Sequence, residues 1–230
     1  MCKLKSVIVL KDKVYCPDHD SHQKMLEELG IEDTTENAMR RFVRCELSPK
    51  AEDNYASNIS EWELKVDQDI LPDWWDSNTY RPMVEDTVRE WQSKHVIASG
   101  EADVRDGVYY AYDCATVHAS SSATVRAYGS ATVDAYGSAT VYANDSATVY
   151  AYGSATVHAR NYATVHDYGY DTVHAYGYAT VIIRAYSKVS ENNITLADNA
   201  ILINHRNKQI TMPKQYEVVN NGNEDRRNAK

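Results

Sequence analysis

The chain has 230 residues, and its 33 Asp and Glu outnumber its 24 Lys and Arg to give a net charge of −9. This balance argues against a nucleic-acid partner, because the capture of phosphates needs a basic stripe. No apolar run could span a membrane, no signal-peptide pattern opens the chain, and the four cysteines have no disulfide-framework spacing, so we expect a cytoplasmic protein without a membrane partner.

Residues 1–98 predict a small α+β domain. It opens with a hairpin over residues 5–16. A helix follows, capped by Asp20 or Ser21 and ended by Gly30.

Two strands and a second helix complete this domain. Apolar residues alternate with charged ones over residues 43–47 and 62–66, which is the period of a half-buried strand. Pro82 is predicted to open a helix, because proline suits the first helical turn and apolar residues follow at helical spacing. Those apolar residues are Val84, Val88 and Trp91.

The acidic and aromatic segment over residues 67–76 is the best candidate site of the first domain. Trp74 and Trp75 are hard to bury together in a loop, so we predict that they belong to a binding surface. No nucleophile, phosphate-binding loop or catalytic triad accompanies the carboxylates. We therefore assign no catalytic residue and predict that the protein is not an enzyme.

Cys16, His19 and His22 have the residue types of a zinc site. Their spacing lacks the paired CxxC pattern, and a buried cysteine followed by a polar loop and a helix cap explains them as well. We therefore predict no metal and no cofactor.

An eight-residue repeat occupies the second half of the chain. Ala-Thr-Val returns every eight residues from Ala115 to Ala179, and Asp171-Thr172-Val173 takes one place in this series. The first six positions are rich in Thr, Val and Tyr, whereas the seventh carries Gly, Asn, Asp or Ser, which suit turns. Each octad therefore predicts one strand and one corner, and the series predicts a stacked solenoid.

Side chains alternate along a strand, which separates an inner from an outer face. Positions one, three and five (Ala, Val, Ala) must lie inside, because position four includes Arg126 and Asp134. Such small inner residues predict a mainly β protein with a flat two-sided β-solenoid of two octads, 16 residues, per coil. A three-sided coil is the runner-up. We place the solenoid and its C-terminal cap at residues 99–212 and a flexible tail at 213–230.

The outer octad positions carry the candidate binding residues. Tyr recurs at position six, His recurs at position four, and from Tyr162 onward Tyr replaces Ser at position eight. Stacked in register, these side chains would form ladders that stabilise the surface or bind a partner. Two octads per coil would stack His158 on His174 and place His166 on the opposite face. The predicted set is Tyr150, Tyr152, His158, Tyr162, His166, Tyr168, Tyr170, His174, Tyr176 and Tyr178.

The octads resemble the repeats of bacterial ice-nucleation proteins. The matching residues are Tyr136-Gly137-Ser138 with Thr140, and Tyr152-Gly153-Ser154 with Thr156. The resemblance implies 16-residue coils and ice binding, although the Thr-x-Thr of that family is absent here.

Residues 1–96 resemble an uncharacterised domain of bacteriophage and prophage proteins. The segment from Lys65 to Trp74 carries this resemblance. It implies a phage-encoded protein that acts in the cytosol of a bacterial host.

The sequence predicts a non-catalytic interaction protein that binds and inhibits a host protein through its aromatic ladders. A bacterial immune effector is the specific partner that we expect, and self-association through a solenoid face or end is a further expectation. The alternatives are a solenoid that binds a small ligand or glycan, a metal-dependent enzyme in the first domain, and ice binding.

Overall fold

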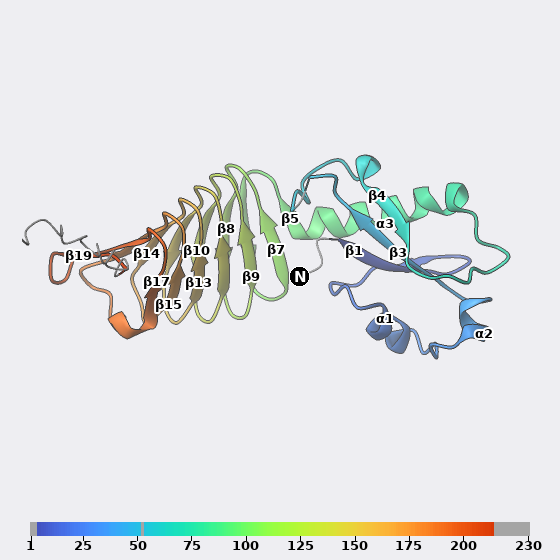
Figure 1. The fold of residues 1–230 in the computed structure, drawn as a ribbon, viewed down its shortest axis with the longest axis horizontal. Coiled ribbons are helices and arrows are strands. Elements are labelled where there is room, and N and C mark those ends of the chain that lie inside the picture. Colours follow the sequence, from blue (N-terminus) through green and yellow to red (C-terminus); the bar gives the residue numbers. More distant parts are fainter. Residues whose placement is uncertain (1–3, 52, 214–230) are drawn as a thin grey trace, which may run out of the picture.

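The computed structural model describes residues 4–51 and 53–213 and shows a mainly β protein with two parts (Figure 1). A small α+β head forms one end, and a β-solenoid extends from it. Helix α3 (Ser77–His95) runs through the head toward the solenoid. The strand directly after it, β5 (Val96–Ile97), already belongs to a solenoid sheet, just upstream of the start predicted at residue 99.

The head is built on an antiparallel sheet with the strand order β2-β1-β3-β4. Its central strand β1 is buried on both sides: Val7 and Val9 pack in the cluster that contains α3, and Ile8 packs in the cluster that contains α1. The predicted hairpin, the first helix and the two half-buried strands are all present. The elements are β1 (Lys5–Val9), β2 (Val14–Tyr15), α1 (His22–Glu28), α2 (Thr35–Ala38), β3 (Val43–Ser48), η1 (Ile59–Glu61) and β4 (Glu63–Val66).

Helix α3 begins earlier than the sequence predicts. It starts at Ser77, and Pro82 lies inside it. The Asp76 carboxylate accepts a hydrogen bond from the backbone N–H of Thr79 at 2.8 Å, so this aspartate is the N-cap. The cap stabilises a helix start at Ser77, and Pro82, which has no N–H to donate, is tolerated near the N-terminal end of the helix.

The solenoid consists of two facing sheets that the chain visits alternately. Thr132 pairs with Thr116 on one side and Thr148 on the other, so equivalent positions are 16 residues apart. The two-sided coil is thereby confirmed, and the three-sided alternative is wrong.

The two sheets are named here by their number of described strands. The eight-stranded sheet contains β6 (Glu101–Val104), β8 (Thr116–Ala119), β10 (Thr132–Ala135), β12 (Thr148–Ala151), β14 (Thr164–Asp167), β16 (Thr180–Ile183), β18 (Ile201–Asn204) and β19 (Gln209–Thr211). The seven-stranded sheet contains β5, β7 (Val108–Ala111), β9 (Thr124–Ala127), β11 (Thr140–Ala143), β13 (Thr156–Ala159), β15 (Thr172–Ala175) and β17 (Ile194–Leu196). A short 3₁₀ turn, η2 (Glu191–Asn193), precedes β17. Pairing within the two sheets is parallel, except that β19 runs antiparallel to β18.

The core between the sheets contains the residues that the octad pattern places inside. Val133, Val149 and Ala151, for example, are fully buried, whereas the Thr and variable positions between them are partly exposed. Most corners adopt the left-handed backbone expected of position seven, including Asp113 (φ 50°) and Asn161 (φ 56°). The predicted division into inner and outer positions is therefore confirmed.

The head covers the first coil of the solenoid. The Tyr112 hydroxyl accepts a hydrogen bond from the backbone N–H of Tyr55 at 2.9 Å, and the rings of Tyr55 and Tyr110 are 4.5 Å apart. The ring of His95, the last residue of α3, lies within hydrogen-bond distance (3.0 Å) of the Val108 carbonyl. These contacts close an end that would otherwise expose unpaired strand edges.

No helix among residues 4–51 and 53–213 is both long and apolar enough to cross a membrane. Nearly all of the predicted tail lies outside the described residues, because the description ends at residue 213.

Candidate functional site: aromatic ladders on the solenoid

The outer face of the seven-stranded sheet carries a ladder of rings. Tyr142 stacks on His158 at 4.8 Å between ring centroids, and His158 stacks on His174 at 5.0 Å, which confirms the predicted pairing of the two histidines. Burial, together with the nearby charges of His174 and Arg160, lowers the pKa of His158. The lowered pKa favours the neutral form of the His158 ring. The ladder ends on a cation toward the head, because the Arg126 guanidinium lies 4.9 Å from the Tyr142 ring.

The outer face of the eight-stranded sheet carries His166, opposite the other two histidines as predicted. Its ring stacks on Tyr150 at 4.8 Å, and Arg184 Nη2 donates to its Nδ1 at 2.7 Å. Burial, followed by the Arg184 charge, lowers the pKa of His166. A guanidinium can only donate, so the bond requires a neutral ring with its proton on Nε2.

Nearer the head, the same face is charged. His118 lies between Glu101 (2.7 Å) and Asp134 (3.0 Å), and the hydrogen bond to Glu101 is the main cause that raises its pKa. The face thus changes from charged residues beside the head to neutral rings toward the C-terminal coils.

At one edge of the solenoid, the chain leaves each strand of the eight-stranded sheet and turns toward the seven-stranded sheet. We call the aromatic and basic residues at this edge of the C-terminal coils the Tyr168 edge. The Tyr152 ring stacks on Tyr136 at 5.0 Å and on Tyr168 at 4.9 Å, and the Arg184 guanidinium lies 5.8 Å from the Tyr168 ring. The Lys188 ammonium lies 5.8 Å from the Tyr170 ring. The Tyr168 edge comprises Tyr152, Tyr168, Tyr170, Arg184, Tyr186 and Lys188, and Tyr136 lies one coil nearer the head.

The opposite edge carries a second set, the Tyr176 edge, made of Arg160, Tyr162, Tyr176 and Tyr178. The rings of Tyr162 and Tyr178 stack at 5.3 Å, and the Arg160 guanidinium lies 5.9 Å from the Tyr176 ring. Both edges therefore combine stacked tyrosines with an arginine at one end.

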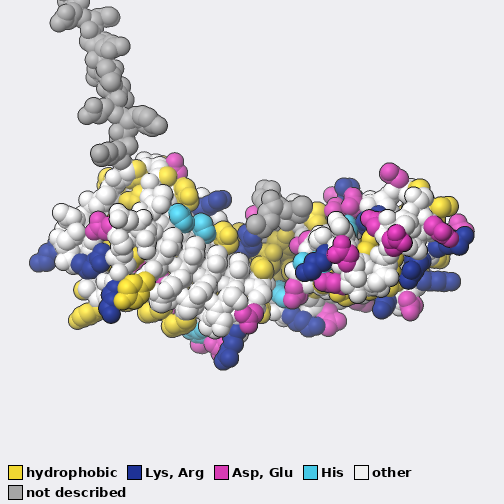
Figure 2. Space-filling view, turned by 90° about the horizontal axis from the view of Figure 1, so that it is seen from below, with side chains coloured by type: hydrophobic (Ala, Val, Ile, Leu, Met, Phe, Trp, Pro, Cys, Tyr) yellow, Lys and Arg dark blue, Asp and Glu magenta, His cyan; other side chains and the backbone are white. Residues whose placement is uncertain are grey.

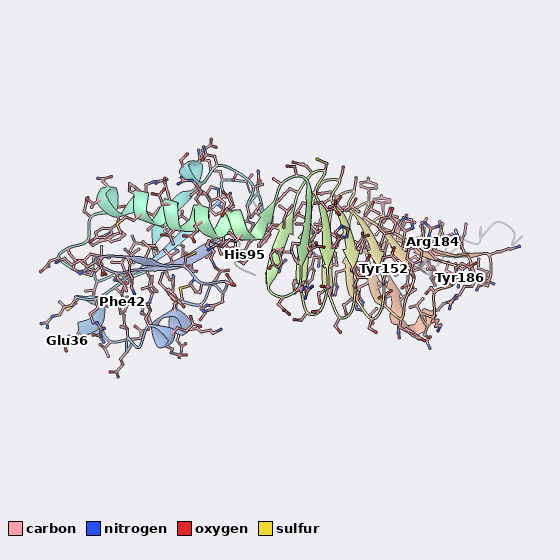
Figure 3. The ribbon with its side chains drawn as sticks, turned by 180° about the vertical axis from the view of Figure 1, so that it is seen from behind. Glu36, Phe42, His95, Tyr152, Arg184 and Tyr186 are labelled. Carbon is pink, nitrogen blue, oxygen red and sulfur yellow. The ribbon has the colours of Figure 1, made fainter. Side chains whose placement is uncertain are left out.

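The tyrosines at octad position eight are the most exposed aromatic residues of the solenoid. Tyr162, Tyr170, Tyr178 and Tyr186 are 65%, 57%, 57% and 91% exposed, whereas upstream octads carry Ser at this position. Figure 3 shows Tyr186 near the far end of the solenoid, beyond Tyr152. Charged side chains crowd the visible surface of the head, whereas uncharged groups dominate the visible surface of the solenoid (Figure 2).

The predicted binding residues of the solenoid do not share one surface. His158 and His174 lie on the seven-stranded sheet, and Tyr150 and His166 lie on the eight-stranded sheet. The tyrosines divide between the two edges. They form a belt around the C-terminal coils instead of a single patch.

Trp74 and Trp75 belong to the head and are half-buried there. Trp75 stacks on Tyr80 at 5.3 Å, and the indole N–H of Trp74 donates to the Arg40 carbonyl at 2.8 Å. They directly precede the start of α3, which lies at the end of the head remote from the solenoid (Figure 1). These tryptophans therefore cannot share a compact surface with the C-terminal tyrosines.

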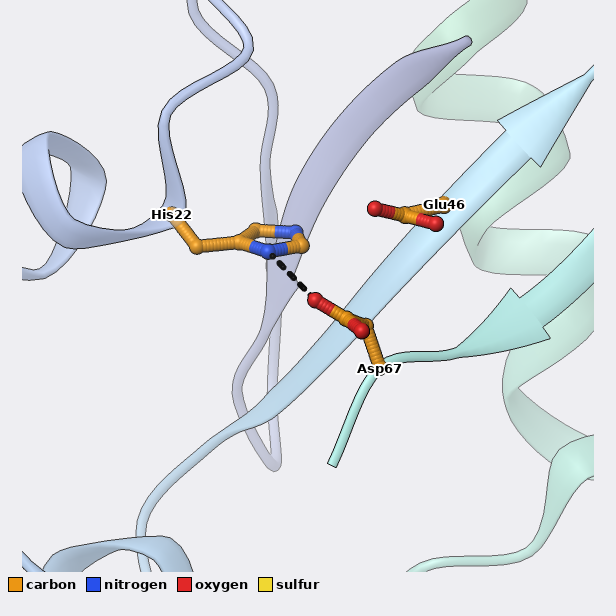
Figure 4. Close-up of side chains that lie close together, drawn as sticks. All are labelled: His22, Glu46 and Asp67. Atoms are coloured by element: carbon orange, nitrogen blue, oxygen red, sulfur yellow. Dashed lines mark ion pairs between the residues drawn. The ribbon is translucent and has the colours of Figure 1, made fainter. Parts of the chain in front are cut away.

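The three zinc candidates do not converge. His19 pairs with Glu28 at 3.0 Å, and burial raises the pKa of the Cys16 thiol to about 11, which disfavours the thiolate that binds zinc. His22 lies instead beside Glu46 and Asp67 (Figure 4). Among the described residues, this is the one group of at least three His, Cys, Asp or Glu side chains whose ligand atoms lie close enough for one ion.

The sequence reasoning missed a pair of buried carboxylates, Asp167 and Asp171. Both occupy inner octad positions where the repeat has Ala, and both are fully buried. Asp171 accepts hydrogen bonds from the backbone N–H groups of Ala155 (2.8 Å) and Gly169 (3.2 Å), and Asp167 Oδ1 accepts one from the Ser187 hydroxyl at 2.5 Å. The signal was present in the sequence, because a charged residue at position one or five must point inward.

Comparisons with known proteins place the chain in no family. No protein-family model matches it, and neither a curated protein nor a solved structure matches it. The strand pairing shows the solenoid of 16-residue coils. The resemblances to ice-nucleation and phage proteins gain no support as family assignments.

Proposed function

We propose that this protein is a non-catalytic binding protein whose C-terminal coils hold a protein partner against the Tyr168 and Tyr176 edges. The observation that carries the proposal is the exposure of Tyr162, Tyr170, Tyr178 and Tyr186. Exposed aromatic clusters are typical of interfaces, because burying the apolar ring surface against a partner removes it from water, which is favourable.

A purely structural role explains these four tyrosines less well. The ladder at position six already stacks along the Tyr168 edge, and Tyr152 is buried enough there for its pKa to be raised. At position eight, Tyr162 and Tyr178 do stack on each other, yet more than half of each side chain stays in water. Serine suffices at this position upstream, so the octad does not need tyrosine for folding.

The basic residues of the two edges define the chemistry of the partner. Arg160 and Lys188 are exposed and lie beside tyrosine rings, and Arg184 is half-buried in the same belt. Tyrosine and arginine are the residues most enriched at the energetic centres of interfaces. A protein surface with carboxylates and backbone carbonyls would complement them.

Within this proposal, the partner we favour is a bacterial immune effector that binding inhibits, and the protein is phage-encoded and cytoplasmic. This part rests on the resemblance of residues 1–96 to a phage domain.

The test compares capture of partners from bacterial lysate by the parent and two paired variants. Tyr170→Ser with Tyr186→Ser alters the Tyr168 edge, and Tyr162→Ser with Tyr178→Ser alters the Tyr176 edge. We expect both to melt within about 2 °C of the parent, because exposed substitutions usually cost under about 0.5 kcal/mol, and at least one to lose the partner.

The control is Tyr136→Ser, the same chemical change on the same side of the solenoid but nearer the head and outside the Tyr168 edge. It should retain the partner. Equal capture of the same partner by the parent, the control and both paired variants would contradict the proposal.

A further inference from the structure

We infer that His22, Glu46 and Asp67 form a binding site in the head for one divalent transition-metal ion, with Zn²⁺ as the preferred ion. The inference concerns the head alone and does not depend on the function proposed for the solenoid.

Three elements bring the ligands together. His22 is the first residue of α1, Glu46 lies in β3, and Asp67 directly follows β4. One ligand atom from each lies within 4.8 Å of the other two (Figure 4). Two ligands of a tetrahedral zinc ion are about 3.4 Å apart when each bond is about 2.1 Å. His22 Nδ1 and Asp67 Oδ2 are already 3.4 Å apart.

The other nitrogen of His22 fixes which ring atom faces the carboxylates. Nε2 lies 3.2 Å from the backbone carbonyl of Cys45, and a carbonyl can only accept, so Nε2 carries a proton. In the neutral ring, Nδ1 then has the free lone pair. This second contact is the arrangement that orients metal-binding histidines in known sites.

A metal ion between Nδ1 and Asp67 would turn this close contact into two ligand bonds. A lone pair and a carboxylate oxygen repel each other at 3.4 Å unless a proton or a metal ion lies between them. Glu46 brings a second carboxylate to the same point. Two carboxylates balance the charge of a divalent ion, and the imidazole adds a third ligand atom.

The surroundings favour an exchangeable site with a rigid base. The side chains of His22 and Glu46 are largely buried, whereas Asp67 is 45% exposed. The backbone N–H of Asp67 donates to the Arg44 carbonyl at 2.9 Å, which holds this residue beside β3. Lys65 approaches Glu46 at 3.8 Å, but its side chain is mostly exposed and can move away when a cation binds.

The donor set selects the class of ion. Imidazole nitrogen suits zinc and its neighbours in the first transition row, whereas Mg²⁺ and Ca²⁺ prefer oxygen ligands throughout. Three protein ligands would leave a position for water on a four-coordinate ion.

Calorimetric titration of the full-length protein with Zn²⁺, after removal of metal with a chelator, tests the inference. We expect one equivalent to bind, and Glu46→Gln and Asp67→Asn each to weaken binding at least about tenfold. His19→Gln is the matched control, because His19 lies on the same segment but pairs with Glu28, and it should bind as the parent does. Melting of each metal-free variant establishes that it is folded.

A long-range proton–nitrogen spectrum identifies the ligand atom. Zn²⁺ should shift the Nδ1 resonance of His22 and leave the ring-nitrogen resonances of His19 in place. Absence of binding at about 100 μM Zn²⁺, or binding that His19→Gln removes while Glu46→Gln and Asp67→Asn leave it intact, would overturn the inference.

Discussion

Val149 and Tyr150 are adjacent residues with opposite environments. Val149 is fully buried between the two sheets, and Tyr150 stacks on His166 on the outer face. The sequence predicted this difference because Arg126 and Asp134 recur at the position of Tyr150. At the level of single residues, inner and outer positions were therefore predictable from the alternation alone.

A charge introduced at these two positions should have opposite effects. Val149→Asp places a carboxylate in the core without donors arranged for it and should cost roughly 3–5 kcal/mol, enough to unfold the surrounding coils. Tyr150→Asp should fold. Circular dichroism and melting of both variants decide the matter, and equal tolerance of the two would refute the assignment of the faces.

Asp167 shows what an inner carboxylate needs in order to be tolerated. Burial is the main cause that raises its pKa to about 7, and the Asp171 charge acts in the same direction, whereas Ser187 and Arg206 oppose it. Its Oδ2 atom has no hydrogen-bond partner among the described residues. Protonation removes the charge that burial penalises, so the folded chain binds this proton more tightly than the unfolded chain does.

This proton gives stability a pH dependence of known sign. An ordinary Asp ionises near pH 3.8, whereas folded Asp167 keeps its proton to about pH 7. Stability is therefore highest below about pH 4 for this group and falls, by a few kcal/mol at most, as the pH rises through about 7. Asp167→Asn should show a smaller loss of melting temperature between pH 5 and pH 8 than the parent. Identical losses would contradict the account.

At the scale of elements, each octad makes one strand and one corner, as its composition predicts. The corner at Gly169 differs, because it is buried and its φ is not in the left-handed range of most other corners. A Cβ there would lie 2.5 Å from the backbone nitrogen of Gly153 in the preceding coil. Glycine is required at this corner because the backbones of two neighbouring coils approach each other closely, which the repeat pattern alone cannot reveal.

Two corner substitutions on the same edge should separate these requirements. Gly169→Ala must displace backbone atoms and should destabilise by about 1–3 kcal/mol. Gly137→Asn should be nearly neutral, because the nearest atom to its Cβ position is 3.4 Å away and asparagine tolerates its left-handed backbone. Denaturant unfolding of both variants measures the difference, and the reverse order would show that corner φ matters more than space.

The start of α3 was mispredicted because two competing signals lie close together. Pro82 suits a first turn, but Asp76 caps the helix six residues earlier by accepting a hydrogen bond from the Thr79 N–H. Trp74 and Trp75 pack on Tyr80 beside this cap. Tertiary packing of Trp74 and Trp75 thus orders a segment that sequence composition marks as a loop.

At the scale of the molecule, the architecture was predictable, whereas the grouping of side chains in the head was not. The octad spacing predicted a stacked solenoid, and the small inner residues favoured a 16-residue coil over the three-sided alternative. The pairing of Thr132 with Thr148 confirms the 16-residue coil. The same alternation of octads predicted that His158 stacks on His174 and that His166 lies on the opposite face. The group of His22 with Glu46 and Asp67 joins a helix to two strands far apart in sequence, and no local pattern signals it.

Hydroxyl-radical footprinting with a captured partner tests most directly whether the belt of tyrosines around the C-terminal coils is a binding surface. This method reports the reactivity of each tyrosine side chain. The account predicts that the partner protects Tyr162 and Tyr178 of one edge, or Tyr170 and Tyr186 of the other, and leaves Tyr136 reactive. Protection confined to Trp74 and Trp75, with all four tyrosines as reactive as in the free protein, would contradict it.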